Sequence, residues 1–327
     1  MVILSHWLPD HWINNFQIGR LGVDLFFVIS GFLITRILFQ LKENTLPISQ
    51  KLKTFFIRRA LRIFPLYYFV VLITYIFNGG IFEEALLWNL FYGSNFFILE
   101  LDSWPGIMSH FWTLSVEEHF YLFWPFVILI PNKNRTLYAI SMVILIGLLS
   151  RFLFFYFEFP YLYSYIFTSS CFDAFGIGGV LGFLYFYKNG FLYDKILQHK
   201  LLLALCCLGF TISIASTNIP GQYFHAWNSI LFRFFYAILF FFLVGFSINS
   251  KSILLNNKYL VFLGKLSYSM YLFHNFIPGF LMGIQYPVNI YLRFFLYFPC
   301  LILVSYFSWK LIELPFNRLK LKFKYVP

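Results

Sequence analysis

The sequence predicts an all-α polytopic membrane protein, and three observations carry this prediction. Of the 327 residues, 60% are hydrophobic and only 11% are charged, whereas soluble domains average roughly 45–50% apolar and about 25% charged residues. Aromatic residues make up 24% of the chain and lie inside long apolar runs, not in the alternating pattern of outer-membrane strands. Nine windows are long and apolar enough to cross a bilayer. A soluble two-domain fold is therefore excluded.

Each predicted span is a run of about 20 mainly apolar residues. The nine windows are 22–41, 61–78, 111–130, 136–155, 169–187, 200–217, 228–248, 260–283 and 291–312. Residues 1–8 are apolar but too few to cross, and they lack the basic flank and cleavage site of a signal peptide. We expect them to be the remnant of a first helix truncated at its N-terminus. No repeat or linker divides the chain, so 1–327 is expected to form a single transmembrane domain.

The lysines and arginines indicate the orientation of the bundle. The loops after spans 22–41, 111–130, 169–187 and 228–248, together with the C-terminal tail, hold 20 of the 24. By the positive-inside rule these segments, including the C-terminus, are cytoplasmic. The net charge of +11 then needs no nucleic-acid partner, because the basic residues punctuate apolar segments instead of covering a soluble face.

Whether segment 86–99 crosses the membrane is ambiguous. It is about 14 residues of mainly apolar sequence within the stretch 78–110, which has no Lys or Arg. If it crossed the membrane, every later basic loop would move to the outside. We therefore interpret it as a re-entrant or interfacial segment on the outer face. In span 169–187, Ala174, Gly178 and Gly182 recur every four residues, which predicts close approach of a neighbouring helix.

The histidines and cysteines show no metal-ligand spacing. The four cysteines lie within apolar runs without a CxxC motif, which is typical of small buried hydrophobic residues. The seven histidines are scattered, so no metal site is expected. The sequence also contains no phosphate-binding loop, dinucleotide fingerprint or nucleophile elbow.

Charged residues inside a bilayer usually face a cavity or each other and mark a functional path. In the predicted outer half these polar residues are His6, Asp24, Glu117, Glu118 and Arg233. A short outer turn separates the helices of His6 and Asp24, so Asp24 is the candidate that holds one imidazole tautomer. The other ring nitrogen is then free to take a proton or accept an acyl group. Alternatively, His6 is structural and Asp24 is a helix N-terminal charge.

Glu117 and Glu118 are adjacent on a predicted helix and point in different directions. They therefore do not form the paired carboxylates of a glycosidase. We expect one to face the bundle and the other the surface, and Glu117 is the alternative partner of His6.

A second polar group lies at the predicted cytoplasmic edge. Arg58, Arg59 and Arg62 open a helix, and residues three and four apart share a helical face. Guanidinium groups suit phosphate oxygens, so the run predicts a phosphorylated ligand at the cytoplasmic mouth. The alternative is an anchor to lipid headgroups.

Four stretches resemble the membrane acyltransferase family 3, bacterial inner-membrane O-acyltransferases that modify polysaccharides and peptidoglycan. They are Ser5-His6, 22–33 (GVDLFFVISGFL), the arginine run ending at Pro65, and 111–121 (FWTLSVEEHFY). Weaker resemblance lies in 266–274 and 312–316. No esterase-like domain follows the last span, so the chain resembles the stand-alone form.

This resemblance implies transfer of an acyl group from cytoplasmic acyl-CoA, commonly acetyl-CoA, to a hydroxyl of an exported polysaccharide or lipid-linked glycan. It implies that His6 is the catalytic histidine, that Glu117 is the family's acidic residue, and that Arg59 and Arg62 bind the donor. It places the chain in the bacterial inner membrane among lipids. A membrane transporter or flippase for a glycan or small solute is the alternative, because intramembrane charges also mark transport pathways.

Overall fold

The structure, a computed structural model, describes residues 1–8, 17–78, 81–187, 203, 207–208, 230–231, 233–249, 255–281 and 290–323. Within these residues every regular element is a helix, which confirms the predicted all-α class. Five helical segments of this part are long and apolar enough to cross a membrane. They are Ile18–Lys42, Ile48–Phe77, Lys133–Tyr156, Thr168–Phe186 and Phe294–Lys322. The predicted number of nine spans is not confirmed.

The helices follow the apolar runs of the sequence. In chain order they are α1 (Val2–Trp7), α2 (Ile18–Lys42), α3 (Ile48–Asn78), α4 (Ile81–Glu84), α5 (Leu86–Leu90), α6 (Ser94–Leu101), α7 (Phe111–Leu129), α8 (Lys133–Tyr156), α9 (Tyr161–Ile166), α10 (Phe172–Phe186), α14 (Arg233–Asn249), α15 (Lys258–Phe273), α16 (Phe276–Leu281), α17 (Ile290–Ser308) and α18 (Leu314–Leu319). Short 3-10 turns lie at Gly106–Met108, Thr168–Cys171 and Lys320–Lys322, and a π turn lies at Trp309–Glu313.

Two predicted spans, 260–283 and 200–217, are not seen as continuous helices in the described residues. Span 260–283 is not continuous, because α15 ends at Phe273 and α16 begins at Phe276. The two residues at this break, His274 and Asn275, bond to other parts of the protein, and non-helical backbone at membrane depth is tolerated where protein surrounds it. Most of span 200–217 lies outside the described residues.

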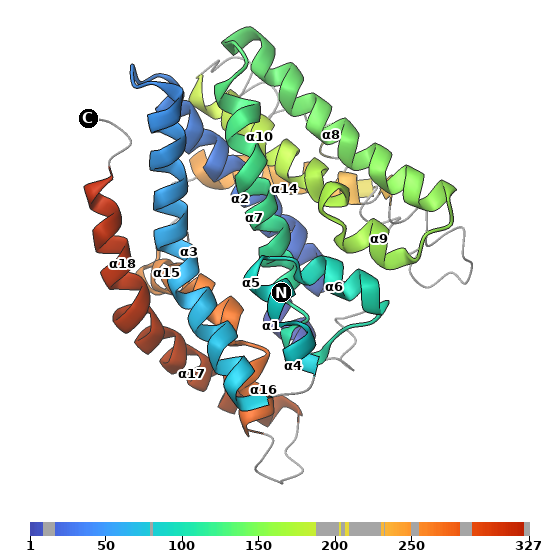
Figure 1. The fold of residues 1–327 in the computed structure, drawn as a ribbon, viewed down its shortest axis with the longest axis vertical. Helices are drawn as coiled ribbons and strands as arrows, with labels where there is room; N and C mark the ends of the chain where they lie inside the picture. The colour runs from blue at the N-terminus through green and yellow to red at the C-terminus, as the bar shows by residue number, and fades with distance from the viewer. Residues whose placement is uncertain are drawn as a thin grey trace.

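Segment 86–99 forms the two short helices α5 and α6, of five and eight residues. Each is far below the roughly 20 residues that a crossing needs, so the segment does not cross as one helix. Helices α4 and α5 lie beside the later half of α3, far from the loop that joins α2 to α3, and α6 packs against α7 (Figure 1).

The core of the bundle is formed by α2, α7 and α10, with α8 and α14 packed against them. Helix α7 has 14 of its 19 residues buried, and its exposed large side chains are Leu122 and Phe126. Helices α2 and α10 touch through backbone, since a Cβ at Gly178 would lie 2.1 Å from the Val28 carbonyl oxygen. A Cβ at Gly31 would lie 2.1 Å from the Phe175 oxygen. The close approach predicted from the small-residue stripe is confirmed.

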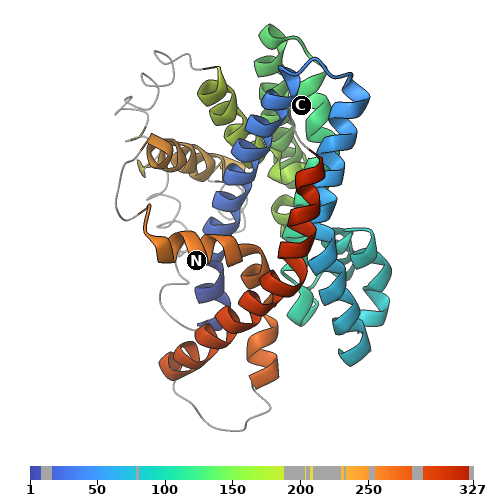
Figure 2. The same ribbon diagram turned by 90° about the vertical axis from the view of Figure 1, so that its left-hand side faces the viewer.

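The C-terminal helices form a second layer along α3. Helices α17 and α18 cross the molecule obliquely, and α18 lies beside the first half of α3 (Figure 2). The Arg58 guanidinium of α3 donates to the Lys320 carbonyl oxygen at 3.0 Å and also to that of Phe323. The end of α18 and the start of α3 therefore lie at the same end of the bundle.

Candidate active site

Three imidazole rings meet beside the break between α15 and α16. His6 comes from the end of α1, His110 precedes α7, and His274 follows α15. The ring centroids of His6 and His274 are 5.0 Å apart, and those of His110 and His274 are 4.8 Å apart. We call these three residues the histidine cluster. Because its members are distant in sequence, only the tertiary fold creates it.

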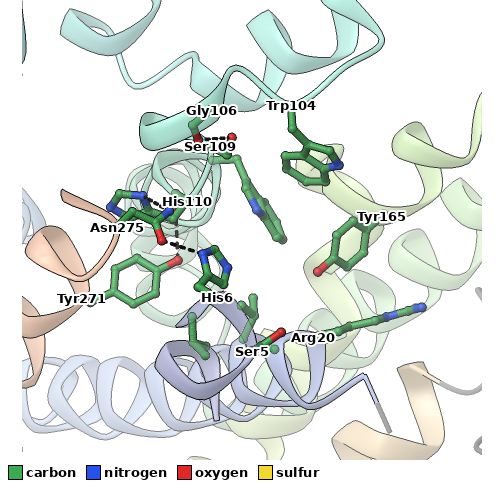
Figure 3. Close-up of a pocket in the computed structure, with 14 residues that line it drawn as sticks. Ser5, His6, Arg20, Trp104, Gly106, Ser109, His110, Tyr165, Tyr271 and Asn275 are labelled. Carbon is green, nitrogen blue, oxygen red and sulfur yellow. Dashed lines mark hydrogen bonds between the residues drawn. The ribbon is translucent and has the colours of Figure 1, made fainter. Parts of the chain in front are cut away.

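Asn275 joins two members of the histidine cluster through its side-chain amide. Its Oδ1 lies 2.6 Å from His6 Nδ1, and its Nδ2 lies 3.0 Å from His110 Nδ1 (Figure 3). On the far side of the ring, His110 Nε2 lies 3.1 Å from the Leu272 carbonyl oxygen. The group that orients His6 is therefore an amide, not the carboxylate of Asp24 that the sequence led us to expect.

Asp24 is instead one half of a buried ion pair. Arg233 Nε donates to Asp24 Oδ1 at 2.8 Å, and both side chains are fully buried. The helical geometry of α2 explains the difference, because α1 packs over Gly19 and Gly22. Asp24 lies two residues beyond Gly22, about 200° around the helix. It consequently faces α14, and the predicted contact with His6 is not formed.

A pocket of about 400 Å³ opens beside His6. Its walls carry the aromatic side chains of Trp104, Trp112, Tyr165 and Tyr271 together with the edge of His6 (Figure 3). Helix α1, the segment before α7, and the α15–α16 break all contribute to this lining. The His6 side chain is exposed, so its ring is accessible to a molecule that enters the pocket.

His110 forms the buried end of the site. Its side chain is 3% exposed, and burial together with the neighbouring imidazoles of His274 and His6 lowers the pKa of His110 well below its ordinary value. A charged imidazole is costly where water cannot solvate it. His110 is thus held in the neutral form.

Glu117 and Glu118 are both buried, at 5% and 9% exposure. The expectation that one would face the surface is wrong, because the first half of α7 is covered by protein at both residues and its exposed side chains, Leu122 and Phe126, lie in the second half. Glu117 Oε1 accepts from Ser30 Oγ at 2.6 Å and from the Tyr121 hydroxyl. Glu117 thus bonds to Ser30 and Tyr121, and His6 bonds to Asn275.

The three arginines of α3 have separate environments. Arg58 bonds to the backbone at the end of the chain. Arg59 lies between the rings of Phe55 and Tyr121, at 5.7 and 5.6 Å from their centroids, and is buried. Arg62 is exposed. The predicted convergence of the three guanidinium groups on one ligand is not what the structure forms.

Arg62 instead lines a second pocket, of about 350 Å³. Lys265 of α15 and Lys320 after α18 line the same pocket, with Trp309, Glu313 and Asn317. Three cations from three separate elements therefore surround it. Charge-bearing side chains of this kind bind phosphate groups.

Sequence reasoning missed several residues of these sites. Asn275 stands beside His274 inside a predicted span, and this pair of polar residues was the available signal. Sequence reasoning also missed the Arg151–Asp173 ion pair, which is fully buried at 2.6 Å and lines neither pocket, although each residue is a charge within a predicted span. Lys265 and Lys320 gave no distinctive signal, because isolated lysines at a cytoplasmic edge are common.

In the residues that the structure describes, no group of three or more His, Cys, Asp or Glu side chains is arranged to hold a metal ion.

The fold and the two pockets thus define a helical bundle with membrane-length apolar helices, an accessible imidazole and a separate cationic pocket. Residues 1–310 match the family described as acyltransferase domain. The chain belongs to this family, which confirms the predicted enzyme class and gives no support to the transporter alternative.

The chain is similar to proteins named as O-acetyltransferases. O-acetyltransferase OatA of Staphylococcus aureus strain NCTC 8325 is 28% identical over 99% of this chain and 57% of its own length. Peptidoglycan O-acetyltransferase OatA of Listeria monocytogenes is 34% identical over 46% of this chain and 26% of its own length. The chain spans about half the length of the curated relatives it matches over nearly its whole length. No solved structure matches it.

Proposed function

We propose that the chain transfers an acyl group, in the simplest case acetyl, from cytoplasmic acyl-CoA to a hydroxyl of a cell-envelope polysaccharide or lipid-linked glycan. The observation that carries this proposal is the accessible His6 imidazole at an aromatic pocket in a chain of the acyltransferase family. The names of the relatives, which include a peptidoglycan O-acetyltransferase, support acetyl as the group and an envelope glycan as the acceptor.

The acceptor occupies the pocket beside His6. Its volume of about 400 Å³ lies within the range of roughly 300–1,000 Å³ of small-molecule sites. Trp104 and Tyr165 offer flat apolar surfaces, on which the apolar face of a sugar ring can lie while its hydroxyls remain hydrogen-bonded. The segment before α7 supplies Trp104, and we assign acceptor choice to this segment.

His6 acts on the acceptor hydroxyl. In the direct route, the ring nitrogen takes the hydroxyl proton as the oxygen forms a bond with the thioester carbonyl carbon. The carbon–sulfur bond then breaks, and the leaving thiolate takes the proton from the imidazolium. In the alternative route the unprotonated ring nitrogen bonds to the thioester carbonyl carbon, and the CoA thiolate leaves. The acceptor hydroxyl then attacks the acyl-imidazole, the carbon–nitrogen bond breaks, and the hydroxyl proton goes to the thiolate. Both routes need one ring nitrogen that carries no proton.

The donor binds at the cationic pocket. Arg62, Lys265 and Lys320 offer positive charge to the phosphate groups of CoA. Helix α15 connects this pocket with the acceptor pocket, because Tyr268 lines the first and Tyr271 the second. Three residues along a helix correspond to a rise of about 4.5 Å. The walls of the two pockets therefore adjoin, which supports transfer between them.

The two buried carboxylates have supporting parts in this scheme. Glu117 interacts electrostatically with Arg59 and Arg62 and so helps to fix the position of Arg62, which lines the donor pocket. Asp24 holds Arg233 beside Tyr165, which lines the acceptor pocket. We therefore propose that Asp24 and Glu117 position the walls of the site, while His6 carries the chemistry.

The membrane setting follows from the basic residues. We propose the bacterial inner membrane, with the cationic pocket, the α2–α3 loop and the C-terminus on the cytoplasmic side. The location of the start of α3 and the end of α18 at one end of the bundle supports a common side for them. Lipids surround the exposed apolar faces of α3, α8 and α17.

The test uses membrane vesicles that contain the chain, labelled acetyl-CoA and an envelope glycan. We expect label in the glycan, and we expect His6→Ala to reduce the transfer rate at least about 100-fold at an unchanged protein level. His119→Gln is the matched control, because His119 bonds to Thr168 at 2.8 Å away from both pockets. Transfer by His6→Ala at the wild-type rate would disprove the role of His6, and uptake of unmodified glycan without transfer would favour a transporter.

A further inference from the structure

We propose that Asn275 and His110 are positioning residues that fix His6 in the tautomer with its proton on Nδ1 and leave Nε2 as the reactive nitrogen. The catalytic consequence rests on the proposed function, whereas the tautomer itself does not. No family match or relative assigns a role to either residue. One chain of hydrogen bonds runs from the Leu272 carbonyl oxygen through His110 and Asn275 to His6 at the pocket.

The chain begins at the Leu272 carbonyl oxygen, which only accepts hydrogen bonds. It lies 3.1 Å from His110 Nε2, so that nitrogen carries the proton. A neutral imidazole has a single N–H, and His110 is buried among other imidazoles that oppose a second proton. His110 Nδ1 is therefore an acceptor.

The amide of Asn275 transmits this direction to His6. Its Nδ2 donates to His110 Nδ1 at 3.0 Å, which directs Oδ1 toward His6. The contact of Oδ1 with His6 Nδ1 is 2.6 Å, slightly shorter than an ordinary N–H···O hydrogen bond, and it requires a donor on one side and an acceptor on the other. With the amide reversed, the same short contact would join two nitrogens. His6 Nδ1 is therefore the donor, and Nε2 keeps its lone pair.

A competing arrangement places the His110 proton on Nδ1, toward the Ile107 carbonyl oxygen at 3.1 Å. Each arrangement leaves one carbonyl oxygen facing a lone pair, that of Leu272 in the competing one and that of Ile107 in the proposed one, both at 3.1 Å. The competing arrangement in addition makes Ile107 and a reversed Asn275 share one proton. The arrangement that we propose makes three separate hydrogen bonds. It is favoured because three hydrogen bonds with a separate proton each stabilise a buried network more than one proton shared between two acceptors.

The free nitrogen has a use only if it faces the reactants. Figure 3 shows the His6 ring bonded to Asn275 on one side, with its other side toward the pocket between Asn275 and Tyr165. The hydrogen bond to Asn275 thus occupies His6 Nδ1, and His6 Nε2 is left to bond to the acceptor hydroxyl. A hydrogen bond to one ring nitrogen sets the state of the other in this way.

The test measures the tautomer without any substrate. The full chain, labelled with ¹⁵N-histidine and placed in lipid nanodiscs, is studied by two-bond ¹⁵N–¹H correlation, which distinguishes Nδ1–H from Nε2–H rings. The His6 signals are identified by their loss in His6→Ala. We expect the Nδ1–H form in the wild type and a shift toward the Nε2–H form in Asn275→Leu. An Nε2–H ring in the wild type, or an unchanged ring in Asn275→Leu, would overturn the inference.

A second variant guards against a folding defect. Asn275→Asp keeps an oxygen opposite His6 Nδ1, so the Nδ1–H form should persist, and the added negative charge should move the acid limb of the rate–pH profile to higher pH. In Asn275→Leu we expect kcat to fall about tenfold or more, with KM for the glycan within about twofold. A purely structural role would change the folded fraction and KM but not the tautomer.

The two proposals fail in different ways. If the His6 ring has the Nδ1–H form but the membranes transfer no acyl group, the proposed function is wrong and the hydrogen-bond chain stands. If transfer depends on His6 but the ring has the Nε2–H form, the function stands and the inference about Asn275 and His110 is wrong.

Discussion

Asp24→Asn is expected to lower the stability of the protein far more than it lowers the turnover of each folded molecule. The reason is the ion pair with Arg233, in which Nε and Oδ1 are 2.8 Å apart and both side chains are 0% exposed. Arg20, one turn earlier on α2, also interacts electrostatically with Asp24. Removal of the single carboxylate leaves the fully buried Arg233 guanidinium without its counter-charge, and the half-buried Arg20 loses a nearby anion as well.

The magnitude follows from the burial of this pair. Loss of one partner of a buried ion pair costs about 3–5 kcal/mol, which is about two to three and a half orders of magnitude in the folding equilibrium. The double variant Asp24→Asn with Arg233→Met should regain most of this loss, because it removes the second charge as well. Arg20 remains bonded to the Tyr161 hydroxyl at 2.9 Å, so the recovery should be incomplete.

A double-mutant cycle measures this coupling. The wild type, both single variants and the double variant are unfolded in mixed micelles of increasing denaturing detergent, and acyl transfer is measured per folded molecule. Asp173→Asn serves as a matched control, because the Arg151–Asp173 pair is equally buried and lies outside the acceptor pocket. If Asp24→Asn is as stable as the wild type yet inactive, Asp24 acts in the chemistry and our reasoning is refuted.

Three further predictions test the donor pocket, the helix packing and the topology. Arg62→Lys should raise KM for acyl-CoA about tenfold, since Lys keeps the charge but loses the planar donor pair; kinetics with varied acyl-CoA measure this, and an unchanged KM contradicts it. Gly178→Leu should abolish the folded protein in a detergent-stability assay, because a Cβ there would lie 2.1 Å from a carbonyl oxygen, whereas Gly264→Ala, with nothing within 4 Å, should be tolerated. Tags near Gln50 and at the C-terminus should be protected from external reagents, and a tag near Asp102 should react; a protected Asp102 tag would reverse our topology.

The helices of the bundle could be predicted because apolar length is a local property of the sequence. The close approach of a helix to the small-residue face of α10 could be predicted for the same reason, since small residues four apart lie on one helical face; that the partner is α2 could not. The break after Phe273 could not, because the flanking residues keep the window apolar across it. A continuous span and two shorter helices give the same average hydropathy over 260–283.

The partners of the polar residues were harder to predict, because they depend on rotation about helix axes. Asp24 is near His6 along the chain, but about 200° of helical rotation separates it from the face that α1 covers. The three arginines of α3 share a broad face, yet Tyr121 of α7 takes one of them and the C-terminal backbone takes another. Their separation is decided by helices that are distant in sequence.

Helix α15 contributes to both pockets, and its position depends both on its apolar length and on its contacts with helices that are distant in sequence. Its middle turns line the cationic pocket with Lys265 and Tyr268, and its last turn places Tyr271 in the wall of the pocket beside His6. The helix must then stop, because Asn275 reaches both His6 and His110 from the turn that follows. A continuous helix would carry that residue further around its axis. The irregular backbone at this point therefore places the Asn275 amide against the His6 imidazole. The polar pair His274–Asn275 is the feature of the sequence that indicates this break.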